Sequence, residues 1–496
     1  MKTARARKSL VWMLTALAAL PVSARAQDLL TVWQAAREHD RTLAVARAAH
    51  DASQTSREQA AALRRPTVSA TLGAGWGESS SHMDGAKFSA PGMGAFDGAS
   101  FAASAHGAAT RAAIVAQYPL LNRGREASRA QLELGADMGD AAWRAAQSEL
   151  ILRIAEHYFA LAVAQERLRV TERQTRMLEK IATEAHDRFD LGDTPITDVH
   201  EADAALADAR AQIESARLQV ELSRQTLSHS TSMDMPDAQL PARSQPPQGS
   251  LQQWLDAAQM RNPQVQLAQQ SVAMAKHELS RRSAGNAASV DLVAQFAQQR
   301  VDNGSFGSSG NRNSDGLIGV QLNIPLYDGG ASSAQTSEGA RLLDKAQAQL
   351  DLAREQVTEQ VRAAWLGWQA GQARVTALEQ GLKASAARLD ATRLGREAGD
   401  RTLLDVLNAE NDYARATLSL AEARVDQVAN RLRLAALADR LDEGVLNEIN
   451  AGLAPETAPA AAPNARIKAR PAGTTTADGA MPDAPLLTSR PRKEHK

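Results

Sequence analysis

An internal repeat constrains the fold of this chain more than any other feature of its sequence. Tyr118-Pro119-Leu120 is answered 206 residues later by Ile324-Pro325-Leu326. The run LGDTPITDV at 191–199 is answered 207 residues later by AGDRTLLDV at 398–406. Landmarks that keep their order and nearly their spacing predict two copies of one structural unit within a single fold.

Both copies, a first repeat at 27–240 and a second at 241–450, change their hydrophobic period in the same order. A helical pattern comes first, and apolar residues then alternate as they do in paired strands. Segments rich in Gly, Ser and Ala, at about 77–108 and 302–316, predict loops between those strands. The expected first helices lie at roughly 28–62 and 250–282, and the expected strands at about 66–77, 108–120, 288–300 and 316–325.

The rest of each repeat is helical and unusually long. No proline interrupts 124–190 or 331–398, and about 67 helical residues would extend close to 100 Å. In the first repeat Val199, Leu206 and Ile213 recur every seven residues, which predicts a left-handed coiled coil. The expected fold class is therefore mainly α with a small β part. The expected long helices lie at 124–190, 195–232, 331–398 and 402–440.

The two ends of the chain do not belong to this fold. Residues 1–26 combine basic residues, an apolar run and a small-x-small cleavage site, and so predict a signal peptide. The tail at 451–496 is rich in Ala and Pro, and we expect it to be disordered in the periplasm. Cleavage would remove five basic and no acidic residues, changing the formal charge from −1 to −6, so nothing favours nucleic-acid binding.

Four strands per chain cannot close a barrel on their own. A closed barrel needs about eight strands or more, and lipid tolerates no open sheet edge. If the mature chain enters a membrane, several copies must therefore share one barrel. Trp76, Tyr118, Phe296 and Tyr327 are the candidates for an aromatic girdle. The alternative is a water-soluble hairpin that caps a coiled coil.

The order of these elements resembles the TolC-type family of outer-membrane efflux channels. The run GDRTLLDVLNA at 399–409 resembles the second helical-hairpin tip of that family, and 189–199 resembles the first. Arg261-Asn262-Pro263 resembles the Asn-Pro that opens a family repeat, where the first repeat has Asp40-Arg41 instead. The resemblance covers roughly 28–450.

The resemblance implies a homotrimer in the cell outer membrane, with a shared twelve-stranded β-barrel in outer-membrane lipid. The helices would form an α-barrel across the periplasm, closed at its inner tip. Its partners would be a periplasmic adaptor and an inner-membrane translocase of the ABC, RND or MFS type. Such a duct performs no chemistry and needs neither cofactor nor metal. The competing hypotheses are a non-channel periplasmic coiled-coil scaffold and, with less support, a periplasmic adaptor.

The resemblance also implies a gate at the hairpin tips. Asp405 matches the position whose carboxylates, repeated by threefold symmetry, form a ring that attracts cations. Asn408 stands where the family often has a second acid, so we expect a single ring. The alternative for Asp405 is an acidic residue in a first helical turn, which the helix dipole favours.

A second group of residues matches the family's closed-state latch. Thr197, Asp198 and Arg401 correspond to positions that tie the inner hairpin to its neighbour, and Arg396 replaces a customary tyrosine. A bond between arginine and a carboxylate or hydroxyl there would be a breakable link. The alternative for Arg401 is a surface ion pair worth less than about 1 kcal/mol.

Several further residues have structural interpretations. Gly192 and Gly399 are expected to allow the turns between antiparallel helices. Thr194 and Pro195 are expected as an N-cap and a first-turn proline, and Pro119 and Pro325 as bends from strand to helix. His82 and His106 lie near Met83 and Met93, where solvent-facing residues are a simpler explanation than a metal site. The sequence contains no phosphate-binding loop, nucleophile elbow or catalytic triad, so we expect no enzyme activity.

Overall fold

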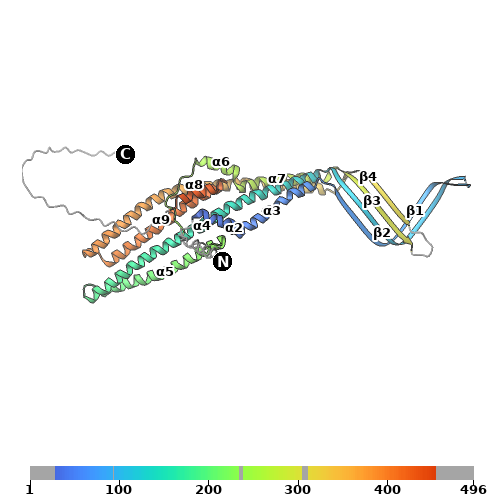
Figure 1. Ribbon diagram of the computed structural model, residues 1–496. Helices are drawn as coiled ribbons and strands as arrows, with labels where there is room; N and C mark the ends of the chain where they lie inside the picture. Colours follow the sequence, from blue (N-terminus) through green and yellow to red (C-terminus); the bar gives the residue numbers. More distant parts are fainter. Residues whose placement is uncertain (1–27, 93, 234–237, 304–310, 454–496) are drawn as a thin grey trace, which may run out of the picture. The chain divides into compact units, whose positions relative to one another are not determined.

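The computed structural model describes residues 28–92, 94–233, 238–303 and 311–453 (Figure 1). The predicted signal peptide at 1–26, Met93 and nearly all of the predicted tail lie outside these residues. No helix within the described ranges is both long and apolar enough to cross a membrane.

The two repeats contain the same helices and strands in the same order, and the second adds a 3-10 turn. The first repeat comprises α2 (Leu29–His39), α3 (Arg41–Ala62), β1 (Thr67–Ala90), β2 (Gly94–Leu121), α4 (Arg123–Asp190) and α5 (Ile196–Thr231). The second comprises α6 (Leu251–Arg261), α7 (Pro263–Ser283), the 3-10 turn η1 (Ala284–Asn286), β3 (Ser289–Asn303), β4 (Asn311–Asn323), α8 (Ala331–Glu397) and α9 (Leu403–Leu437). A short helix, α10 (Glu443–Ala451), follows.

Each expected first helix is in fact two helices. Asp40 has extended backbone angles, and its carboxylate accepts a hydrogen bond from Leu43 N at 2.8 Å, so α3 begins anew there. Asn262 does the same for α7 by accepting from Gln264 N at 2.9 Å, with Pro263 in the first turn. A side-chain cap followed by a helical residue starts a helix even inside a continuous helical pattern.

The first hairpin is longer than the composition predicted. β1 and β2 continue through most of the segment expected as a loop at 77–108, with Trp76 paired to Ala108 and Ser79 to Ala105. Pairing satisfies the backbone N–H and C=O groups of both strands whatever their side chains are. Small side chains therefore weaken the strand signal in the sequence without preventing the ladder.

The four strands form one antiparallel sheet in the order β1-β2-β3-β4 (Figure 1). Because directly paired residues project from the same face, the register assigns a face to every side chain. Val68, Ile114 and Leu292 fall on one face, and Thr67, Gln117 and Asn313 on the other. The first of these, hereafter the apolar face, carries most of the sheet's exposed large hydrophobic side chains. These are Val68, Leu72, Trp76, Ile114, Tyr118, Leu292, Phe296, Ile318, Val320 and Leu322.

The two predicted bends differ from one another. Pro325 lies between β4 and α8, as expected. Pro119 lies inside β2, paired with Asp291 and followed by a register shift before Leu121. Its missing N–H is thus accommodated by an irregular ladder at the end of the strand. The transition to α4 comes at Asn122, which caps that helix by accepting from Arg125 N.

The long helices pack as two hairpins, α4 with α5 and α8 with α9, and α4 also contacts α9 (Figure 1). The heptad pattern of α5 is buried at Val199, Val220 and Leu227. The largest apolar cluster joins α2, α4, α9 and α10 around Tyr158, Phe159 and Leu446. This cluster therefore lies along α4, which contacts both α5 and α9.

Candidate gate at the helical hairpin tips

The two hairpin tips use the same backbone turn. At the first, Gly192 N donates to Phe189 O at 2.9 Å and Asp193 N to Arg188 O at 2.8 Å. At the second, the equivalent bonds run from Gly399 and Asp400 with lengths of 3.0 and 2.8 Å. This pattern is the Schellman motif, which needs a left-handed residue after the helix. Gly192 and Gly399 provide it, with φ of 79° and 85°.

The helices that leave the two turns are capped differently. Thr402 caps α9 through a reciprocal capping box with Asp405. The equivalent N-cap of α5 is Pro195, which makes no side-chain cap bond. The prediction that Thr194 is the N-cap and Pro195 the first helical residue is therefore wrong by one position. Proline has neither an N–H nor a hydroxyl, so the box cannot form at Asp198, the counterpart of Asp405.

The capping box fixes the position and charge of Asp405. Its Oδ2 accepts from Thr402 N and from Thr402 Oγ1, both at 3.0 Å. These bonds, with smaller contributions from the positive charges of Arg401 and Arg388, hold the pKa of the Asp405 carboxyl below its usual range. Asn408 lies one turn further along α9 and is exposed.

Arg396 links the two hairpins within one chain. Its guanidinium lies 3.6 Å from Glu184 on α4, which also pairs with Arg188 at 3.0 Å. The Arg396 side chain is largely buried, while Glu184 is partly exposed. The residue that replaces the family's customary tyrosine thus joins α8 to α4.

The other expected latch residues lie at or near the surface of the chain. Thr197 and Arg401 are exposed and Asp198 is half-buried. Among the described residues, none of these three has a side-chain hydrogen bond or ion pair to the opposite hairpin. Arg401 lies against Gly395, because a methyl group added to Gly395 would stand 2.8 Å from the Cγ of Arg401.

Apolar packing holds the tips together more extensively than charge. Leu403, Val406 and Leu407 at the start of α9 are buried against α4 and α5. Their partners are Leu178, Ile181, Ala182, Ala185, Val199, Ala202 and Ala209. The second hairpin tip therefore packs against the first through a continuous hydrophobic seam.

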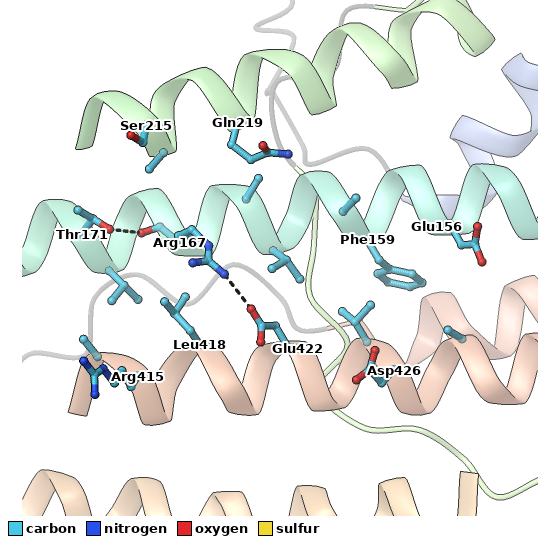
Figure 2. A pocket seen from close by; sticks show the side chains of 18 of the residues that line it. Glu156, Phe159, Arg167, Thr171, Ser215, Gln219, Arg415, Leu418, Glu422 and Asp426 are labelled. Atoms are coloured by element: carbon cyan, nitrogen blue, oxygen red, sulfur yellow. Dashed lines mark hydrogen bonds and ion pairs between the residues drawn. The ribbon is translucent and has the colours of Figure 1, made fainter. Parts of the chain in front are cut away.

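Beyond this seam lies a cavity of about 1080 Å³ that is lined by α4, α5 and α9, and α4 runs between the other two helices in Figure 2. Arg167 of α4 crosses it to Glu422 of α9 at 2.9 Å, as the dashed line in Figure 2 shows. Gln174 and Asn411 make a similar bond at 2.6 Å, and Glu156 and Arg433 an ion pair at 3.0 Å. Polar links thus continue the contact between α4 and α9 where apolar packing is interrupted.

Within the described ranges, no group of three or more histidine, aspartate or glutamate side chains could hold a metal ion. His82 is exposed on β1.

One buried charge in this framework has no counterpart among the predicted sites. Asp40, which caps α3, also accepts from Arg153 of α4 at 2.9 Å, and its side chain is only 5% exposed. Asn262, at the same place in the second repeat, donates to Leu437 O at 2.9 Å. The Asp40-Arg41 and Asn262-Pro263 landmarks signal the caps, but neither reveals the long-range partner.

Comparison with known proteins identifies the family. A family model described as outer membrane efflux protein matches residues 32–232 and 254–439, which include all four strands and both hairpin tips. The chain belongs to this family. TolC of Vibrio cholerae serotype O1 is 30% identical over 328 residues, which cover 65% of this chain and 74% of TolC. The proteases secretion protein PrtF of Dickeya chrysanthemi is 25% identical over 439 residues, 86% of this chain and 90% of PrtF.

Solved structures of outer-membrane proteins share the fold. VceC of Vibrio cholerae has a TM-score of 0.67 at 20% identity, covering 84% of this chain and 97% of VceC. MtrE of Neisseria gonorrhoeae has a TM-score of 0.65 at 19% identity, covering 85% and 93%. The expected fold class, mainly α with a small β part in long antiparallel hairpins, is confirmed. The efflux family is one of channels, and its members include efflux and secretion proteins.

Proposed function

We propose that this chain forms a trimeric exit duct in the outer membrane, serving a tripartite efflux pump or a type I secretion system. The observation that carries the proposal is the four-stranded sheet, whose order leaves β1 and β4 as edges and whose apolar face is exposed. An apolar sheet with open edges cannot stand in lipid. Three copies that join β1 to β4 would give twelve strands and no edge.

In this proposal the helices lie in the periplasm and the hairpin tips form the gate. Asp405 of three chains would ring the constriction, with Asn408 adding no charge. Arg401, Thr197 and Asp198, which are exposed or half-buried in one chain, would link neighbouring subunits in the closed state. Arg396 would instead steady its own chain through Glu184.

The duct itself would be passive. A periplasmic adaptor and an inner-membrane ABC, RND or MFS-type translocase would open the gate and supply the energy, so no catalytic residues are needed. The length of the match to a protease secretion protein, 86% of this chain, supports a secretion-type cargo. A drug-efflux role uses the same architecture.

The decisive experiment is fractionation of the expressed chain. We expect a heat-modifiable trimer that needs detergent for extraction from the outer-membrane fraction. A monomer in the water-soluble periplasmic fraction would instead support the coiled-coil scaffold.

The gate is tested in planar bilayers. The closed trimer should show a small conductance that polyvalent cations block, and Asp405→Asn should weaken that block. Unchanged block and selectivity would show that Asp405 does not line the constriction.

A further inference from the structure

Two arginines stand side by side on the apolar face of the sheet. Arg300 of β3 is directly paired with Arg312 of β4, and on its other side with Thr110 of β2. Steps of two residues keep a side chain on one face, so Arg300 shares its face with Phe296 and Gln298. All three polar residues of this row, Thr110, Arg300 and Arg312, are exposed.

Two aromatic residues show where the arginine row lies along the strands. Tyr118 and Trp76 lie on the apolar face, and Trp76 pairs with Ala108, ten residues from Tyr118 along β2. Ten residues extend about 34 Å along a strand. A tilt of about 45° reduces this to about 25 Å, the height of the lipid-facing band between the aromatic girdles of outer-membrane barrels.

The arginine row lies next to Trp76, at the end of this band that is farther from the helices. Thr110 is two residues from Ala108, so the row stands one side-chain step below Trp76, which is 79% exposed. Phe296, a candidate for the girdle, lies four residues nearer the middle of the band. Tyr327 lies outside the strands altogether, between β4 and α8.

Two like charges paired across strands repel each other, and arginine in hydrocarbon is costly. An anion beside both guanidinium groups offsets the two costs, and phosphate fits them because arginine can donate two parallel bonds to it. Arg300 already has a partner within the chain. A guanidinium has five N–H donors and can therefore engage more than one acceptor at a time.

We propose that Arg300 and Arg312 bind the phosphate of an anionic lipid in the outer leaflet, with the acyl chains lying on the apolar face below. The inference rests on the proposed function, because insertion with the helices in the periplasm puts this end of the strands at the outer leaflet. A lipid is favoured over a soluble anion because the arginine row continues directly into the exposed apolar side chains of the band.

The test uses purified full-length trimer in neutral detergent, titrated with bis-phosphorylated lipid A, with bound lipid counted by native mass spectrometry. At about 1 kcal/mol for each arginine, R300Q/R312Q should weaken binding about 30-fold. The matched control is R111Q, because Arg111 pairs with Gly73 and Gln299 on the opposite face, and it should bind as the wild type does.

Three results would overturn the proposal. The first is equal binding of lipid A by R300Q/R312Q and wild type, and the second is a loss of lipid A binding in R111Q as large as that in R300Q/R312Q. The third is displacement of lipid A by equimolar inorganic phosphate. Should R300Q/R312Q fail to assemble, wild-type binding of lipid A must still fall as salt rises, since salt screens charge; salt-independent binding overturns the proposal as well. Trimer content and bilayer conductance are measured on the same samples. A conducting trimer without lipid selectivity refutes only this inference, whereas absence of a trimer refutes the proposed function.

Discussion

Asp40 shows how one side chain can join two distant parts of the chain. Its carboxylate caps α3 and receives Arg153 from α4, 113 residues away, in an almost fully buried position. Without Asp40, Arg153 keeps among the described residues only a more distant carboxylate, that of Glu149 at 3.8 Å, and loss of a buried partner is strongly destabilising. The position of α3 against α4 therefore depends on this carboxylate.

We predict that Asp40→Ala lowers the free energy of unfolding by about 3 kcal/mol, since both the cap and the nearer carboxylate partner of Arg153 are lost. Asp28→Ala is the matched control, because Asp28 caps α2 by accepting from Thr31 N but is more exposed. It should cost about 1 kcal/mol. Denaturant unfolding followed by circular dichroism measures both, and equal effects would argue against the buried pair.

Thr402 and Thr194, at equivalent hairpin tips, should differ in how much they stabilise the protein. Thr402→Ala should destabilise the protein by about 1 kcal/mol, because it removes the hydroxyl that caps α9. The hydroxyl of Thr194 is buried without a hydrogen-bond partner among the described residues. Thr194→Ala should therefore cost little or nothing. The opposite order in unfolding temperature would restore Thr194 as the functional cap.

The Asp405 carboxylate should make this cap depend on pH. Its folded pKa is lowered from 3.8, so its contribution to stability is fully present above that value and is lost as the pH falls through the folded pKa. We predict that wild type unfolds at a higher temperature than Asp405→Asn at neutral pH, and that the difference disappears in strong acid. Asp198→Asn is the control, because Pro195 cannot form the box. A difference that persists unchanged into acid would contradict this role.

At the scale of elements, the strongly periodic segments were predictable and the local exceptions were not. Long proline-free helices and Gly-Asp turns predicted both hairpins because period and turn chemistry agree over many residues. The break at Asp40 was missed because a capped junction interrupts hydrogen bonding without interrupting hydrophobic periodicity. The length of β1 and β2 was missed because Gly, Ser and Ala signal loops, although a neighbouring strand can still satisfy their backbone.

The contact between the two hairpin tips combines a hydrophobic seam with the ion pair between Arg396 and Glu184. Leu403 is 3% exposed within that seam, whereas Glu184, the partner of Arg396, is close to half exposed. Burial of a leucine outweighs an exposed ion pair, which solvent screens. We therefore expect apolar packing to contribute more than the ion pair to the stability of the contact between the two tips.

We predict that Leu403→Ala lowers the free energy of unfolding by about 2–5 kcal/mol, and that Glu184→Ala lowers it by less than about 1 kcal/mol. Leu404→Ala is the matched control for leucine truncation, because Leu404 is next in sequence but 51% exposed. Denaturant unfolding measures all three. A larger effect of Glu184→Ala than of Leu403→Ala would make the ion pair, and not the seam, the main contact.

At the scale of the whole molecule, the internal repeat gives each chain two hairpins of strands and two of helices, but no closed structure. The helices bury their seams within the chain, whereas the sheet keeps two free edges and one exposed apolar face. The β part is therefore incomplete in a single chain. In the proposed duct, assembly and lipid would complete it together.

Two neighbouring residues of β1 can distinguish exposure to lipid from exposure to water. Leu72 and Thr71 are neighbours on β1, both exposed, but the register puts Leu72 on the apolar face and Thr71 on the polar one. Leu72 lies near the middle of the band between Tyr118 and Trp76, where arginine costs about 2–4 kcal/mol in a lipid-facing position. Leu72→Arg should therefore reduce heat-modifiable trimer in the outer membrane, whereas Thr71→Arg, which would face the interior of the proposed barrel, should assemble normally. Semi-denaturing gels of isolated outer membranes measure both, and equal assembly of the two variants would mean that this face never meets hydrocarbon.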